Sequence, residues 1–242
     1  MYSFESRVRY SECDYKADLS IEGLINYLQD CSTFQSEELG VGYAFMHEHH
    51  FAWFISAWQI WIDQLPHFCD PIKISTWCSA ARATDAHRNF TISSPDNESY
   101  IRADSIWFVF DTKQNRPIRI PASEKVYVQG DAPLDLPPTH RRLPVEGSYS
   151  SATAIQISKQ HLDTNGHVNN AHYVRMAIDA LDRPIDIQRL CVQYKRMALL
   201  GDTIVPRIHY LDNGATVDLT NPQGSTYAVV RLEERGLRKG LS

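Results

Sequence analysis

Residues 161–173 read HLDTNGHVNNAHY, and this stretch carries two local signals that point in different directions. Its Thr–Asn–Gly favours a tight turn, because Asn and Gly tolerate the left-handed backbone that such turns need. After the turn, apolar residues recur at helical spacing, which predicts a helix over 168–181. Asp163, Asn165 and His167 therefore stand at alternate positions on the way into a helix. They either turn the chain and cap the helix, or they carry a reaction.

An earlier part of the chain repeats this order of strand, acidic turn and helix. Aligning Asp14 with Asp163 also aligns Asp30 with Asp179 and brings the starts of the two predicted helices together. The first helix is predicted over 21–39, where one apolar stripe contains Ile21, Leu24, Ile25, Leu28, Cys31 and Phe34. The two halves of the chain are therefore interpreted as copies of one α+β unit, each an antiparallel sheet around one helix.

Residues at the ends of these segments agree with the duplication. Ser20 stands where an N-cap is expected, and Gly40 stands where the first helix should stop. Further along, Asp70 and Asp202 each begin a strand-like stretch. The number of residues between these two positions differs slightly from the number between the starts of the two helices. Loop insertions between the two copies account for that difference.

Alternation of apolar and polar residues predicts the strands. They are 4–10, 51–63, 72–81, 86–93, 100–112 and 116–121 in the first half, and 152–160, 189–196, 203–210, 215–220 and 226–233 in the second. Between the halves, residues 131–150 are rich in proline and lack periodicity, as is typical of a linker or an extended crossing segment. We therefore expect an N-terminal domain over 1–130, a linker over 131–150 and a C-terminal domain over 151–242.

Composition excludes several classes of protein. A chain of 242 residues with 43% hydrophobic and 22% charged residues is typical of a globular protein with a sizeable core. Its formal net charge of −5 argues against nucleic-acid binding. The 5 cysteines are scattered and odd in number, so neither a disulfide framework nor a zinc site is predicted. Without a secretory signal core or an apolar run of about 20 residues, we expect a cytoplasmic protein that has no membrane segment, metal or cofactor.

Several separated segments together resemble the acyl-acyl-carrier-protein thioesterase family. In chain order they are RVRYSECD with LINYLQDCS, ISAWQIWIDQLPHFCDPIKISTW, AHRNFTI, ADSIWFVFDTKQNRPIRIP, DTNGHVNNAHYVRMA and VQYKRMALLGDTI. The resemblance covers nearly the whole chain. It implies two tandem hotdog domains, each an antiparallel sheet wrapped around a long central helix. It also implies hydrolysis of acyl-acyl-carrier protein to free fatty acid, with the carrier protein and the fatty acyl chain as partners.

The resemblance implicates the acid, the amide and the imidazole of the DTNGH run. Asp163 is then the base toward the attacking water, or the direct nucleophile. His167 orients the thioester or the water and protonates the leaving thiolate, and Asn165 holds the geometry by hydrogen bonding. The structural alternatives stay open: Asp163 as a turn and cap, Asn165 as part of a tight turn, and His167 as a polar contact at a helix start.

Thioester hydrolysis also needs donors for the developing oxyanion. No GxSxG nucleophile elbow occurs in the chain, and nothing in the sequence pairs Cys191 with a base. A helix N-terminus exposes N–H groups that suit an oxyanion. We therefore expect the N–H groups of Val168 and Asn169 to form the oxyanion hole.

One departure from the family pattern bears on activity. Where the family runs Tyr–Arg–Arg–Glu, this chain has Tyr194, Lys195, Arg196 and Met197, so the expected second carboxylate is absent. Either Asp163 suffices, or another acid such as Asp202 or Asp70 reaches the site, or activity is reduced. An acyl-CoA thioesterase and a catalytically impaired acyl-thioester-binding hotdog protein remain the alternatives.

The acyl chain requires an apolar lining. The expected lining residues are Ile21, Leu24, Ile25, Leu28 and Trp58, although the same side chains would pack the core of a hotdog domain without any ligand. An acidic carrier protein would dock on a local basic patch. The candidate cations are Arg82, Arg88, Lys113, Arg116, Arg119, Arg141 and Arg142. Pairing of two such chains into a homodimer stays open.

Overall fold

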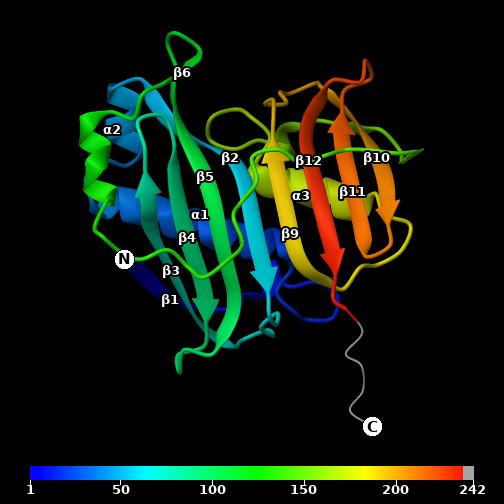
Figure 1. Cartoon of the computed structure of the whole chain (residues 1–242), viewed down its shortest axis with the longest axis horizontal. Coiled ribbons are helices and arrows are strands. Elements are labelled where there is room, and N and C mark those ends of the chain that lie inside the picture. The colour runs from blue at the N-terminus through cyan, green and yellow to red at the C-terminus, as the bar shows by residue number, and fades with distance from the viewer. Residues whose placement is uncertain (237–242) are drawn as a thin grey trace. The chain divides into compact units, whose positions relative to one another are not determined.

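The computed structural model describes residues 1–236 of the chain and divides it into two compact units, Met1–Arg141 and Arg142–Ser242. Each unit contains an antiparallel sheet and one main helix (Figure 1). The end of the predicted C-terminal domain, residues 237–242, lies outside the described residues.

The first unit is built on a five-stranded antiparallel sheet in the order β1-β3-β4-β5-β2, to which the short β6 adds beside β5. Its elements are β1 (Tyr2–Arg7), α1 (Ile21–Glu38), α2 (Tyr43–Glu48), β2 (Phe51–Ile62), β3 (Pro71–Ala81), β4 (Ala86–Ser93), β5 (Ser99–Asp111) and β6 (Arg116–Ile118). The long helix and four of the strands predicted for this half are confirmed. The first strand lies at Tyr2–Arg7 instead of 4–10, and β6 ends at Ile118 instead of 121. The short helix α2 was not predicted, because six residues are too few to show a helical period.

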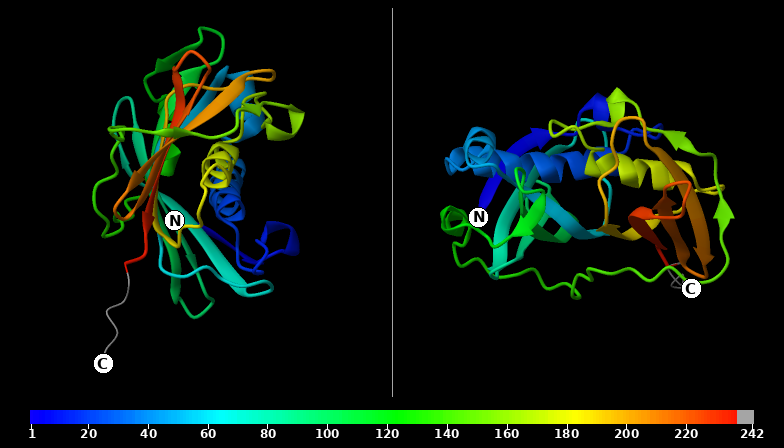
Figure 2. Two further views of the ribbon diagram at one scale, coloured as in Figure 1. Left: turned by 90° about the vertical axis from the view of Figure 1, so that its right-hand side faces the viewer. Right: turned by 90° about the horizontal axis from the view of Figure 1, so that it is seen from above.

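The second unit repeats the arrangement with fewer residues. Its elements are β7 (Ser150–Ser151), β8 (Ile155–Gln156), α3 (Asn170–Asp179), β9 (Ile187–Tyr194), β10 (Thr203–Leu211), β11 (Gly214–Thr220) and β12 (Thr226–Glu234). The sheet order is β9-β12-β11-β10-β7, with β8 paired to the other end of β10. Figure 2 shows the helix of each unit on one face of its sheet.

Two predictions for the second half need correction. The strand predicted over 152–160 is wrong for most of its length: only β8 pairs within that range, and a 3-10 helix follows at Lys159–His161. The helix predicted over 168–181 begins later, because Asn169 is its N-cap. With 10 residues against the 18 of α1, α3 is not the long helix expected in both halves.

The sequence places the start and the end of α1. The Ser20 hydroxyl accepts a hydrogen bond from the Gly23 N–H at 3.0 Å, as an N-cap does. Gly40 has a φ of +74°, a left-handed conformation that glycine adopts without strain. Leu24 and Leu28 are fully buried, whereas Phe34, predicted on the same stripe, is 45% exposed. Both caps are therefore confirmed, and the apolar stripe ends before Phe34.

Arg88 is buried between the sheet and α1. Its Nη1 donates to Gln35 Oε1 on the helix at 2.5 Å and to Thr76 Oγ1 at 3.2 Å, and its guanidinium lies 4.9 Å from the centroid of the Tyr127 ring. Burial lowers the pKa of Arg88. The prediction that Arg88 belongs to a carrier-docking patch is therefore wrong, because its side chain is only 8% exposed.

The proline-rich segment after residue 130 is held on the face of the first sheet opposite α1. Side chains alternate along a strand, so the neighbours of Arg88 on β4 point away from the helix. One side chain from each of three strands bonds the segment's backbone: Trp77 Nε1 donates to the Ala132 carbonyl (2.8 Å), Asn89 Oδ1 accepts from the Leu134 N–H (2.9 Å), and Gln59 Nε2 donates to the Pro137 carbonyl (2.6 Å). Residues 131–137 are therefore fixed to the first unit and do not act as a free tether.

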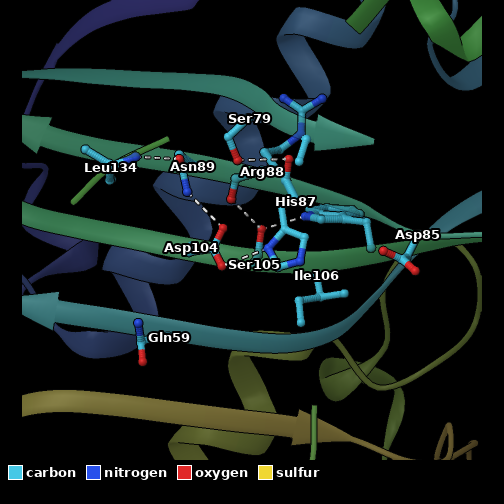
Figure 3. A network of polar contacts seen from close by, with 12 residues as sticks. Gln59, Ser79, Asp85, His87, Arg88, Asn89, Asp104, Ser105, Ile106 and Leu134 are labelled. Atoms are coloured by element: carbon cyan, nitrogen blue, oxygen red, sulfur yellow. Dashed lines mark hydrogen bonds and ion pairs between the residues drawn. The ribbon is translucent and has the colours of Figure 1, made fainter. Parts of the chain in front are cut away.

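Asn89 is the centre of this contact (Figure 3). It also donates to Asp104 Oδ1 at 2.8 Å, and it is 2% exposed. Asn89→Ala leaves the Leu134 N–H and one carboxylate oxygen of Asp104 without their partner, so we expect a loss of about 2–4 kcal/mol in the free energy of unfolding. Denaturant unfolding measures it. Thr91→Ala, on the same face of β4 and without a side-chain hydrogen bond in the described residues, should cost much less; equal losses would contradict the role of Asn89.

His87 makes the other bond to the Asp104 carboxylate, through Nδ1 to Oδ2 at 3.1 Å. This hydrogen bond raises the pKa of His87 above its ordinary value, and partial burial offsets part of the rise. The bond therefore contributes stability that is fully present below the unfolded pKa of roughly 6.5 and is lost as the pH rises through the folded pKa. We expect the difference in unfolding free energy between the natural chain and His87→Gln to be largest near pH 6 and to shrink by pH 9. A difference that is constant across that range would refute this assignment.

Candidate active site

The DTNGH run forms a closed turn braced by its own acid. The Asp163 N–H donates to the His167 carbonyl at 2.7 Å, and Gly166 has a φ of +75°. One oxygen of the Asp163 carboxylate, Oδ1, accepts from the N–H of Asn165 at 2.8 Å and from that of His167 at 3.1 Å. These bonds fix the carboxylate and leave the Asn165 side chain exposed and the His167 side chain half-buried.

The first half contains the same turn. Asp14 Oδ1 accepts from the N–H of Lys16 at 2.8 Å and from that of Asp18 at 3.1 Å, and Ala17, at the position of Gly166, has a φ of +65°. The predicted correspondence of Asp14 with Asp163 is therefore confirmed at the level of single hydrogen bonds. The turn requires the acid alone, since Lys16 and Asp18 stand where the second half has Asn165 and His167.

The amides expected to form an oxyanion hole are already used. The Val168 N–H donates to the Ala198 carbonyl at 3.0 Å, and the Asn169 N–H donates to the His161 carbonyl at 2.9 Å. The prediction is therefore wrong for these two donors, because the chain pairs with neighbouring backbone before α3 begins. The first half makes the same pairs, from Leu19 to Pro66 and from Ser20 to Glu12, both at 2.9 Å.

Asn169 caps α3, since its Oδ1 accepts from the Ala171 N–H at 2.9 Å. The cap brings together two histidines that sequence reasoning did not single out. The rings of His161 and His172 lie edge to face, 5.7 Å apart. Burial and the neighbouring His172 lower the pKa of His161. The sequence offered one sign of this pair: His161 and His172 flank His167 within residues 161–173.

The loop after β9 runs beside the motif and carries Met197. Leu199 pairs with His167 as an isolated antiparallel backbone bridge. The Ala198 N–H donates to the Tyr173 hydroxyl of α3 at 2.8 Å, and burial raises the pKa of Tyr173 to about 12. Met197 is 38% exposed. The position that departs from the family pattern therefore lies in a loop fixed against the predicted catalytic turn.

The other acids and the cysteine considered from sequence have structural surroundings. Asp202 Oδ2 accepts from the Leu199 N–H at 2.9 Å, and Asp70 Oδ2 accepts from the His67 N–H at 2.8 Å in the equivalent loop of the first half. Cys191 is buried, and burial raises the pKa of its thiol, which disfavours a nucleophilic thiolate. These residues brace loops or pack the core.

The predicted acyl-lining residues belong to the first unit. Leu24, Ile25 and Leu28 are 0% exposed, and Trp58 is 1% exposed with its ring 5.0 Å from that of Phe90. Ile21, at the first position of α1, is half-buried. Four of the five side chains therefore lie in the hydrophobic core.

The part of the chain that the structure describes contains no cluster of His, Cys, Asp and Glu suited to hold a metal ion. Among the helices of residues 1–236, none combines the length and the apolar character that crossing a membrane requires.

Superposition on solved structures identifies the fold. The chain superposes on an acyl-ACP thioesterase from Bacteroides thetaiotaomicron with a TM-score of 0.83, at 19% identity, covering 96% of each chain. It superposes on the 12:0-ACP thioesterase from Umbellularia californica with a TM-score of 0.80, at 18% identity, covering 97% of this chain and 96% of the other. At these identities the likeness establishes the fold, which is of the hotdog type.

The family follows from the sequence matches. Residues 1–125 match the model of the acyl-ACP thioesterase N-terminal domain, and residues 148–232 match that of the C-terminal domain. The chain belongs to the acyl-ACP thioesterase family. It is 23% identical over 214 residues to the chloroplastic palmitoyl-acyl carrier protein thioesterase of Gossypium hirsutum, which covers 81% of this chain and 52% of that protein. The chain thus spans about half the length of the curated relatives it matches.

Proposed function

We propose that this chain hydrolyses the thioester of a fatty acyl-carrier protein to a free fatty acid and the carrier thiol. The observation that carries the proposal is the contrast between the two turns. Both have the same bonds around Asp14 and Asp163, but only the second presents an amide and an imidazole, at Asn165 and His167. Family membership over both halves supports the same substrate. In this proposal the two compact units are tandem hotdog domains joined through residues 131–150.

The residues of the second turn have distinct roles in the reaction. Asp163 Oδ2, the oxygen that does not brace the turn, takes a proton from water as the water oxygen attacks the thioester carbonyl carbon. The tetrahedral intermediate then expels the thiolate, which breaks the carbon–sulfur bond, and His167 gives the thiolate a proton. Asn165 donates a hydrogen bond that holds the reacting group. In the covalent variant Asp163 attacks the carbonyl itself and expels the thiolate, which leaves an anhydride. Water then cleaves the anhydride at the Asp163 carbonyl, so single turnover in labelled water leaves the label in this carboxylate.

The acyl chain is assigned to the interior of the first unit, against Ile21, Leu24, Ile25, Leu28 and Trp58. These apolar side chains give a methylene chain the surface that it needs. Because four of them are packed in the core, binding requires them to move apart.

The activity is tested by comparing hydrolysis of acyl-carrier protein and acyl-CoA with matched acyl chains. The released thiol is measured in both reactions. We expect a higher kcat/KM for the carrier-protein substrate. Preference for acyl-CoA would favour the acyl-CoA thioesterase alternative. Binding of both substrates without turnover would favour the impaired acyl-thioester-binding protein, which the absence of the family glutamate at Met197 motivates.

Met197→Glu restores the second carboxylate in the loop beside His167. We expect turnover of acyl-carrier protein to rise by about tenfold or more, because a second carboxylate would help Asp163 to hold and deprotonate the attacking water, and positioned acid–base groups typically contribute 10²–10⁴-fold. Steady-state kcat is the measurement, with Met197→Gln as a neutral side chain of similar length. An unchanged rate in the glutamate variant would show that this position does not limit the reaction.

A further inference from the structure

Residues 195–200, here called the 195–200 loop, present cations and apolar side chains together on the surface of the second unit. Lys195 and Arg196 are exposed, and Leu199 and Leu200 are 50% and 53% exposed. With Met197 they make one continuous segment of the chain. Exposed large apolar residues that cluster next to charged ones are typical of an interaction surface.

Hydrogen bonds hold the backbone of the loop at several positions. The N–H groups of Lys195 and Arg196 both donate to the Tyr227 carbonyl, at 2.8 and 3.1 Å. The bonds from the N–H groups of Ala198 and Leu199, to Tyr173 and Asp202, fix the remainder. Four N–H groups of the loop therefore bond within the second unit, while the side chains of Lys195, Arg196, Met197, Leu199 and Leu200 stay exposed.

The equivalent loop of the first half shows which features the scaffold needs. It makes most of the same backbone contacts: the Leu19 N–H donates to the Pro66 carbonyl as Val168 does to Ala198, and Cys69 has a φ of +69° where Gly201 has +89°. The bond from the Ala198 N–H to Tyr173 has no counterpart, because Pro66 has no N–H. Yet Asp63 and Gln64 stand where the second half has Lys195 and Arg196, by the same alignment. The cations are therefore not required by the turn.

Within residues 1–236, the cations of the loop have no acidic partner. Among the described residues neither Lys195 nor Arg196 forms an ion pair, although Arg196 lies 5.6 Å from the centroid of the Tyr227 ring. Other exposed arginines do form pairs, for example Arg141 with Asp85 at 2.9 Å. In a chain with a net charge of −5, an unpaired basic segment fits an acidic partner.

The place of the loop links it to the catalytic turn. Its Leu199 pairs with His167, and its Ala198 accepts from Val168. A partner that docks here brings its covalently attached acyl group next to Asp163. We propose that the 195–200 loop is the docking surface for the acyl carrier protein, with Lys195 and Arg196 facing the carrier's acidic surface and Leu199 and Leu200 its apolar contact. This inference rests on the proposed function for the identity of the partner.

The test is binding of holo-acyl carrier protein without an acyl group, measured by surface plasmon resonance and independent of turnover. The double variant Lys195→Glu, Arg196→Glu should weaken binding by about tenfold or more, because charge reversal turns attraction into repulsion. It should lower kcat/KM for acyl-carrier protein but leave hydrolysis of acyl-N-acetylcysteamine unchanged. The matched control is Lys16→Glu, Lys125→Glu, which reverses two exposed charges of the first unit and should bind the carrier as the natural chain does.

The outcomes separate this inference from the proposed function. Equal carrier binding by the 195–196 variant and the natural chain overturns the docking surface, as does a loss confined to the control variant at Lys16 and Lys125. The absence of carrier binding by the natural chain overturns it too. Binding that depends on Lys195 and Arg196, without hydrolysis of any thioester, leaves the docking surface standing and overturns the proposed function. The double variant Leu199→Ser, Leu200→Ser should also weaken binding. An unchanged Kd would show that these two leucines do not contact the carrier protein.

Discussion

Asp163→Asn is expected to lower kcat for acyl-carrier protein by about 10²–10⁴-fold while leaving the fold intact. The asparagine Oδ1 accepts the same two hydrogen bonds from Asn165 and His167 that the aspartate accepts at 2.8 and 3.1 Å. An amide oxygen does not serve as a general base or as a nucleophile toward a thioester. The change therefore removes the chemistry and keeps the turn. Steady-state kinetics measure the loss, and thermal unfolding checks that the fold is kept.

The chain contains its own control for this variant. Asp14 braces the first turn with bonds of the same length to Lys16 and Asp18. Asp14→Asn makes the same chemical change in the same local geometry, without an amide and imidazole beside it. We expect it to keep activity within about twofold. Full activity of Asp163→Asn, or equal losses in the two variants, would mean that Asp163 is a turn residue only.

His167→Ala is the second large effect, with an expected loss of about 10²-fold or more in kcat. The backbone of His167 holds the turn and pairs with Leu199, and alanine keeps those bonds. The loss would then report the imidazole itself. Asp18 occupies the same place in the first turn, where its backbone N–H also donates to the acid, so Asp18→Ala is the matched variant. Asp18→Ala should cost little activity; a His167→Ala enzyme as active as Asp18→Ala would exclude the imidazole from the reaction.

Much of the first half could be read from the sequence because its signals are local. Strand β4 was predicted with its observed limits, 86–93, from alternation alone. The Ser20 cap and the Gly40 stop follow from residue chemistry at single positions. The correspondence of Asp14 with Asp163 was also visible, because a duplicated turn keeps the one side chain that its backbone requires.

The errors arose where distant backbone decides the outcome. A helix start predicts free N–H groups, but those of Val168 and Asn169 are taken by Ala198, which is about 30 residues away, and by His161. Residues 152–160 alternate like a strand. Within that range, however, only Ile155 and Gln156 pair with β10 as a strand. Arg88 was expected at the surface because arginine is mostly exposed, and only the tertiary fold supplies Gln35, Thr76 and Tyr127 to hold it inside.

The sequence predicted which residues make up the candidate active site, and the structure corrected how their backbone groups are used. The structure brings Asp163, Asn165 and His167 into one turn, and it adds the 195–200 loop, whose adjacency to His167 no short-range pattern signals. The carboxylate of Asp163 has a structural role as well as the proposed chemical one. That double role is why the conservative change to asparagine is more informative than a change to alanine.

In the proposed function, Asp163 and His167 of the second turn hydrolyse the thioester bond of acyl-carrier protein. Intact-mass analysis of the carrier protein, with enzyme in excess over substrate, follows the conversion of the acylated to the free-thiol form in a single turnover. We expect rapid loss of the acyl mass with the natural chain and with Asp14→Asn, and a rate at least about a hundredfold lower with Asp163→Asn. If the natural chain left the acyl group in place, or if all three proteins removed it equally fast, Asp163 would not be the residue that drives hydrolysis.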